Sequence, residues 1–105
     1  MFGANRDKEA EMAYARAVTF DGVDSKRMEQ MKQEINQGER PENLPATEIM
    51  VLYDRDKEQS LAILFFDSED DYAKGDAVLD AMPAEDTPGS RTSVTKYEVA
   101  VRMTA

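Results

Sequence analysis

The sequence of 105 residues contains no cysteine, no histidine and no tryptophan. Without cysteine the chain forms no disulfide, offers no thiolate nucleophile and lacks the ligand spacing of a zinc finger. Without histidine it lacks the commonest general base and the usual protein ligand of haem, zinc and copper. We therefore expect this protein to use no metal and no cofactor.

Positive charge is also scarce. Lysine and arginine total 13 against 22 aspartates and glutamates, which gives a formal net charge of −9. This field repels a phosphate backbone and an anionic lipid surface, so neither nucleic acid nor a membrane is an expected partner. The sequence has no apolar run long enough to span a bilayer and no basic-then-apolar leader. We expect a soluble, cytoplasmic protein.

The composition is that of a folded protein, with 41% hydrophobic and 33% charged residues. The length suits one domain with a single modest core. Residues 1–11 are rich in charge and have no hydrophobic period, which predicts a flexible N-terminal arm. Residues 12–105 are predicted to form the domain.

Hydrophobic periodicity predicts four strands and two helices in the domain. Asp24 or Ser25 is a suitable cap for the first helix, and Ser68 is a suitable cap for the second. Gly38 suits the end of the first helix, and Pro83 follows the second. The predicted order is strand 13–20, a helix that follows its cap and runs to about Gln37, strand 47–55, strand 61–66, helix 69–82 and strand 94–103.

A β-α-β-β-α-β order with right-handed crossovers gives the ferredoxin-like arrangement. The predicted fold class is therefore α+β, with a four-stranded antiparallel sheet and two helices on one face. A turn centred on Lys57 and Glu58 would pair Tyr53 with Ala62, Val51 with Leu64 and Ile49 with Phe66.

The two middle strands are apolar on both faces, from Ile49 to Tyr53 and from Leu61 to Phe66. About five side chains, among them Leu61, Ile63 and Phe65, would then meet water in a single copy. At about 1.5–3 kcal/mol each, the loss rivals the stability of a small domain, about 5–15 kcal/mol. A second copy of the same sheet is the simplest cover, so we predict a homodimer with these three residues at its interface.

The chain resembles the dimeric α/β-barrel superfamily, in particular the antibiotic-biosynthesis-monooxygenase-like domains. The resemblance rests on the order of elements over residues 12–103 and on three stretches, "YARAVTF", "VLYDRDKEQSLAILFFDSEDDY" and "YEVAV". It implies a homodimer whose sheets meet face to face, with a pocket in each subunit between sheet and helices. Known monooxygenases of the family act on phenolic rings without metal or flavin.

The family positions are only partly retained. Phe66 stands where the family often has tryptophan, Ala62 stands where it has asparagine, and Tyr72 is kept. The missing polar groups argue against oxygenase chemistry, and the missing histidine argues against haem.

Five residues are candidates to line a ligand pocket: Tyr14, Arg16, Phe66, Tyr72 and Met82. Tyr72 combines an apolar ring with a hydroxyl that donates and accepts hydrogen bonds. Arg16 interrupts an apolar strand face, and it would either orient a carboxylate or phenolate or pair with an acid such as Glu98. Tyr53 and the methionines Met28 and Met31 are further possible walls, with ordinary core packing as the alternative for all of these side chains.

Three functions are compatible with this sequence. The first is a homodimeric binding module for a small apolar or aromatic molecule. The second is a cofactor-free monooxygenase or isomerase acting on a phenolic or polyketide-like substrate. The third is a non-catalytic accessory or structural dimer whose pocket is closed.

Overall fold

The computed structural model describes residues 13–38, 43–82 and 89–103. The described helices and strands follow the predicted order along the chain. They are β1 Tyr14–Asp21, α2 Ser25–Asn36, β2 Glu48–Asp54, β3 Gln59–Phe66, α3 Glu69–Asp80 and β4 Ser90–Glu98. The flexible arm predicted for residues 1–11 lies outside the described residues.

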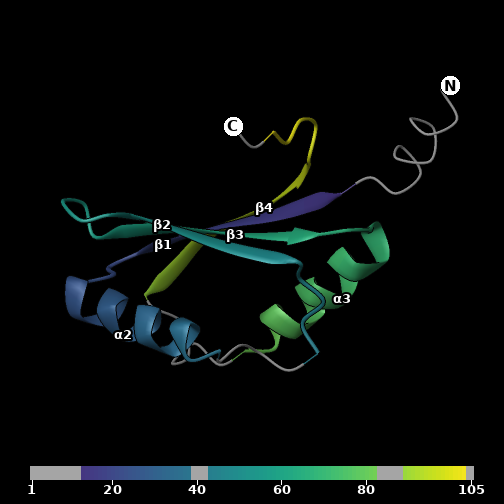
Figure 1. The fold of residues 1–105 in the computed structure, drawn as a ribbon. Helices are drawn as coiled ribbons and strands as arrows, with labels where there is room; N and C mark the ends of the chain where they lie inside the picture. Colours follow the sequence, from purple (N-terminus) through teal and green to yellow (C-terminus); the bar gives the residue numbers. More distant parts are fainter. Residues whose placement is uncertain (1–12, 39–42, 83–88, 104–105) are drawn as a thin grey trace, which may run out of the picture.

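The four strands form one antiparallel sheet in the order β2-β3-β1-β4. Both helices lie on the same side of this sheet (Figure 1). We call that side the helix face and the opposite side the open face. The arrangement confirms the predicted α+β, ferredoxin-like fold.

Polar side chains start the helices as expected. The Asp24 carboxylate accepts a hydrogen bond from the Arg27 backbone N–H at 2.7 Å, and the Ser68 hydroxyl accepts one from Asp71 N–H at 3.1 Å. Both bonds satisfy N–H groups that have no partner within the helix. After α2, Gly38 adopts a φ of 80°, the left-handed conformation that ends many helices.

The core lies between the sheet and the helices in two clusters joined by Ala62. The cluster on the α3 side is centred on Leu44, Ala46, Leu64, Phe66 and Tyr72. The cluster on the α2 side is centred on Val18, Phe20, Val23 and Met28. Each helix therefore covers its own part of the helix face.

The predicted register of β2 against β3 is wrong by two residues. Tyr53 pairs with Ser60 instead of Ala62, because a four-residue turn, Arg55–Glu58, joins the strands. Within this turn Glu58 has a φ of 53°. A shift of two residues preserves the alternation of a strand, so every side chain stays on the face that the sequence predicts.

The last strand begins and ends earlier than residues 94–103. Ser90–Glu98 pairs with β1 along its whole length, with one irregularity in the register between Thr19 and Phe20. The chain then leaves the sheet, and the last bond to β1 runs from Val99 N–H to the Ala13 carbonyl at 3.0 Å.

The segment after β4, residues 99–103, passes over the open face at one end of the sheet (Figure 1). Its Arg102 guanidinium lies 4.5 Å from the centre of the Phe65 ring and forms an ion pair with Glu48. Since Glu48 begins the far edge strand, the segment crosses the sheet from β4 to β2. Its Val101 and Met103 are exposed.

Candidate functional site

Three of the five predicted pocket residues form an aromatic cluster between α3 and the sheet. The Tyr72 ring meets the Phe66 ring at a centroid distance of 5.5 Å and the Tyr14 ring at 6.4 Å, both edge to face. Phe66 is fully buried, and Tyr72 is 7% exposed. The sequence thus identified side chains that meet in space, and the structure packs them against one another.

Arg16 is buried beside this cluster and binds α3. Its Nε donates to Asp76 Oδ1 at 2.9 Å and its Nη2 donates to Asp80 Oδ1 at 3.1 Å. Asp80 also accepts from Arg91 of β4 at 3.0 Å. The pairing with an acid was anticipated, but the partners come from α3 and not from Glu98. These bonds anchor α3 on the sheet, and a ligand role for Arg16 stays a prediction.

A second cation lies over the aromatic cluster. The Lys96 ammonium is 4.9 Å from the centres of both the Tyr14 and the Tyr72 rings. It also donates a hydrogen bond to Glu69 Oε2 at 2.9 Å, which raises the pKa of Lys96. The ammonium therefore joins the start of α3 to β4 and lies over both tyrosine rings.

Burial raises the pKa of Tyr72 above its ordinary value of 10.0, and the nearby Asp76 carboxylate adds to the rise, while Arg16 and Lys96 oppose it. The folded chain thus holds the phenolic proton more tightly than the unfolded chain. The stabilisation that the protonated Tyr72 gives the folded state is complete below the ordinary pKa of 10.0. It is lost as the pH rises through the raised pKa of Tyr72 in the folded chain.

The alkaline titration of the tyrosines tests this environment. In the native protein we expect a late phase of tyrosinate absorbance, above the ordinary tyrosine pKa, that is absent in Tyr72→Phe. The variant should also lose less stability on going from neutral to alkaline pH than the native protein does. A late phase that persists in Tyr72→Phe would assign it to another of the four tyrosines.

Met82 follows the end of α3 and is half-buried. The five predicted pocket residues therefore all lie on the α3 side of the molecule. That side is filled by Phe66, Tyr72 and their neighbours, and the two pockets described next lie elsewhere.

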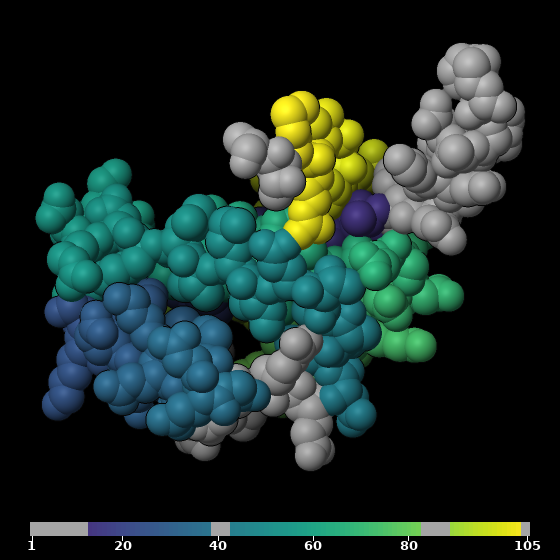
Figure 2. Space-filling view, viewed as in Figure 1, coloured from purple at the N-terminus to yellow at the C-terminus, as the bar shows by residue number. Residues whose placement is uncertain are grey.

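A groove opens between α2 and the edge strand β2, and Figure 2 shows the surface hollowed there. Its volume is about 220 Å³. Apolar side chains make most of its wall, and two cations stand among them. The lining residues are Met28, Met31, Lys32, Ile35, Val51, Tyr53 and Arg55. We call this the α2–β2 groove.

Part of the groove wall consists of buried or hydrogen-bonded side chains, and the rest is exposed to solvent. Met28 is buried, and the Tyr53 hydroxyl donates a hydrogen bond to the Val23 carbonyl at 2.7 Å, which fixes the ring. Ile35 is 44% exposed and lies beside the half-buried Met31 and Val51 in the lining of the groove. The groove thus presents apolar surface that the described chain leaves uncovered.

The predicted interface residues Leu61, Ile63 and Phe65 lie side by side on the open face. In the single chain they are half-buried, because neighbouring strands and the Arg102 side chain cover part of them. Met50 and Leu52 beside them are 39% and 49% exposed. The open face is apolar as predicted, but these three side chains expose less surface to water in the single chain than the estimate from the sequence assumes.

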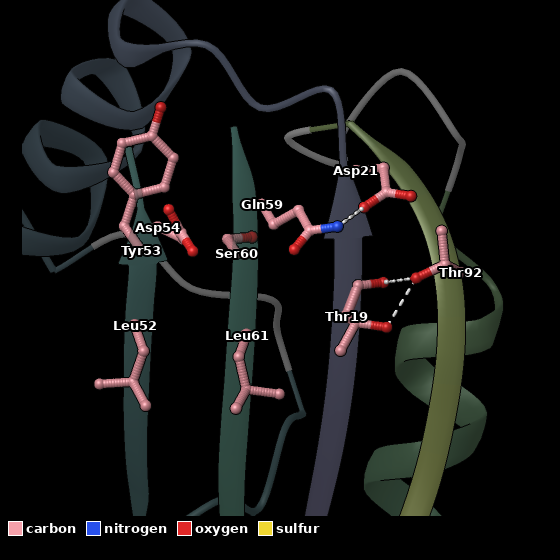
Figure 3. Close-up of a pocket in the computed structure, with 9 residues that line it drawn as sticks. All are labelled: Thr19, Asp21, Leu52, Tyr53, Asp54, Gln59, Ser60, Leu61 and Thr92. Carbon is pink, nitrogen blue, oxygen red and sulfur yellow. Dashed lines mark hydrogen bonds between the residues drawn. The ribbon is translucent and has the colours of Figure 1, made fainter. Parts of the chain in front are cut away.

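A second pocket, of about 430 Å³, lies on the open face near the β2–β3 turn (Figure 3). Leu52 and Leu61 form its apolar part. Four of its polar side chains form two pairs: Gln59 Nε2 donates to Asp21 at 2.9 Å, and the Thr19 and Thr92 hydroxyls are 2.6 Å apart. The Ser60 hydroxyl, which also lines the pocket, is buried and has no hydrogen-bond partner among the described residues.

Other site types find little support in the part of the chain that the structure describes. It contains no group of three or more acidic side chains placed to hold a metal ion. None of its helices is long and apolar enough to cross a membrane.

Comparisons with protein-family models, with curated proteins and with solved structures give no match for this chain. Sequence reasoning had considered Met28, Met31 and Tyr53 as walls of a cavity, and the structure brings them together. The sequence did not indicate Lys32 or Arg55 as lining residues. Arg55 lies in the turn after β2, which has no hydrophobic period from which its position could be predicted.

Proposed function

We propose that this protein is a homodimeric binding module for a small apolar or aromatic molecule, which it holds in the α2–β2 groove. The observation that carries the proposal is the groove itself. Met31, Ile35 and Val51 present apolar surface there without a cover among the described residues. Small-molecule sites are typically concave and mostly apolar, with a few polar groups at defined points.

The size of the groove limits the ligand. Its volume of about 220 Å³ exceeds the roughly 150 Å³ of an engineered apolar cavity that binds benzene. It is smaller than the roughly 300–1,000 Å³ of pockets for drug-sized molecules. A single ring with a short substituent fits this range. Methionine side chains adapt to varied shapes, which suits a tolerant site.

The homodimer is supported by the open face. Met50 and Leu52 are 39% and 49% exposed beside the half-buried Leu61, Ile63 and Phe65, and Tyr97 of β4, on the far side of β1, is 55% exposed. A two-fold pairing of this face with itself, beside the segment 99–103 that already lies over one end of it, would cover the exposed members together. The groove lies on the other side of the sheet, between α2 and β2, so it stays accessible in such a dimer.

This proposal keeps the resemblance to the dimeric α/β-barrel superfamily, whose pockets lie between sheet and helices. It differs in the position of the pocket within the subunit. The ligand lies under α2 and not at the cluster of Tyr14, Phe66 and Tyr72, which is packed with its own side chains.

Methionine methyl NMR with neutral single-ring probes such as phenol and benzyl alcohol tests the proposal. We expect saturable shifts of the Met28 and Met31 methyl signals. Ile35→Glu should weaken binding by about tenfold or more, because burying an aliphatic side chain is worth about 1.5–3 kcal/mol.

The matched control is Gln33→Glu, which adds the same charge to the exposed surface of the same helix without lining the groove. This variant should bind like the native protein. Probes that shift no methionine signal, or that bind Ile35→Glu and Gln33→Glu equally, would contradict the proposed site.

A further inference from the structure

The α2–β2 groove carries two cations on its rim in a chain whose net charge is −9. Lys32 stands on the helix side and Arg55 stands at the end of β2, where the turn begins. Only 13 of the 105 residues are cationic, and two of them line this one small groove. A neutral apolar ring would form no ion pair with either side chain, so their presence favours an anionic ligand.

Arg55 is the less engaged of the two. Its guanidinium carbon lies 5.5 Å from the centre of the Tyr53 ring, which is itself part of the groove wall. Among the described residues it forms no ion pair. The preceding Asp54 faces the other side of the sheet, where it lines the open-face pocket.

Lys32 is only weakly neutralised. Its ammonium is 3.3 Å from Glu29 Oε1, and both side chains are more than half exposed, 56% and 57%. Ion pairs of this kind contribute little, since water and side-chain entropy oppose them. Lys32 is therefore free to turn toward an anion in the groove.

We infer that the ligand of this groove is a small aryl carboxylate, an apolar ring that bears one anionic group. The inference rests on the proposed function and adds the charge of the ligand to it. The ring lies on Met28, Met31 and Val51, and the carboxylate lies against the Arg55 guanidinium. A guanidinium suits this task because its planar donors match the two carboxylate oxygens.

The arrangement has a built-in selectivity. Arg55 lies over one tyrosine of the wall, so an anion that carries a ring can contact the guanidinium and cover apolar surface at the same time. A free inorganic anion gains the charge contact alone, and a neutral arene gains the apolar contact alone. Because the cations lie at the rim, screening by salt should weaken carboxylate binding more than amide binding.

Phenylacetate and phenylacetamide, which differ in charge and share the ring, test the inference in methionine methyl NMR titrations at low salt. We expect phenylacetate to bind the native protein about threefold to fivefold more tightly than the amide, because an ion pair at an exposed rim contributes modestly. Arg55→Gln should reduce phenylacetate to the level of the amide. Lys57→Gln, in the same turn and with the same change of charge, does not line the groove and should leave the preference intact.

The outcomes separate the two proposals. If both compounds bind with equal affinity to the native protein, the site is right and the inference about charge is wrong. If neither binds at millimolar concentration, the proposed function fails with it. If Lys57→Gln abolishes the preference as fully as Arg55→Gln does, the effect is one of overall charge, and the assignment to Arg55 is overturned.

Discussion

Ile63→Asp is expected to break the proposed homodimer and leave a folded monomer. Ile63 lies in the middle of the open face, where it pairs with Ala17 of β1 and Met50 of β2. In the single chain its side chain is half-buried, so an aspartate there still reaches water. In the proposed dimer the same aspartate would be enclosed between two sheets.

The effect should be large because a two-fold interface contains each substitution twice. A buried carboxylate without a partner costs several kcal/mol, so the dissociation constant should rise by roughly a thousandfold or more. Light scattering coupled to size exclusion reports the mass, and far-ultraviolet circular dichroism reports the fold.

The control for this substitution is Ala73→Asp, which adds the same charge on an exposed position of α3, away from the open face. It should leave the mass unchanged. An Ile63→Asp protein that remains dimeric would place the interface on another surface. A protein that unfolds would leave the open face to be tested by Leu52→Asp, since Leu52 is 49% exposed.

Phe66→Ala is expected to lower the free energy of unfolding by about 3–5 kcal/mol, a large part of the stability of a small domain. Phe66 is fully buried, and it reaches the backbone of α3 at Gly75. A Cβ atom at position 75 would lie 2.3 Å from Phe66 Cε1 and 2.6 Å from Cζ. The ring therefore occupies the space that the glycine leaves empty.

This close approach predicts a reversal of sign in Gly75→Ala. In the native background the added methyl group overpacks the core and should destabilise the protein, although alanine is the better helix former. In the Phe66→Ala background the ring is gone, and the same substitution should stabilise the helix by up to about 1 kcal/mol. Urea denaturation of the native protein, the two single variants and the double variant gives the four free energies of unfolding that this double-mutant cycle needs. Stabilisation by Gly75→Ala in both backgrounds would contradict the packing described here.

Most of the fold could be predicted because it depends on local patterns. Alternation in β1, the helix stripe of Met28 and Met31, and the caps at Asp24 and Ser68 are each visible within a few residues. The β2–β3 register was missed by two residues because it depends on the geometry of a turn. The last strand was predicted to begin at residue 94 and begins at Ser90, because residues 90–93 carry no apolar side chain that could show an alternation.

The candidate site was harder to predict, because it depends on contacts between distant parts of the chain. The sequence identified Tyr14, Phe66 and Tyr72 as neighbours, but it did not show that Gly75 lets the ring of Phe66 fill that space. Arg16 finds partners 60 and 64 residues further along the chain. Such pairs are set by how α3 crosses the sheet, which no local pattern encodes.

The most direct test of the account is the mass of the unmodified protein in solution, because the proposed dimer would cover the apolar open face. Sedimentation velocity from submicromolar to high micromolar concentration gives this mass without a surface or a label. We expect twice the mass of one chain over the micromolar range, with dissociation only on dilution. A species with the mass of a single chain at every concentration, with its sheet intact, would contradict the account.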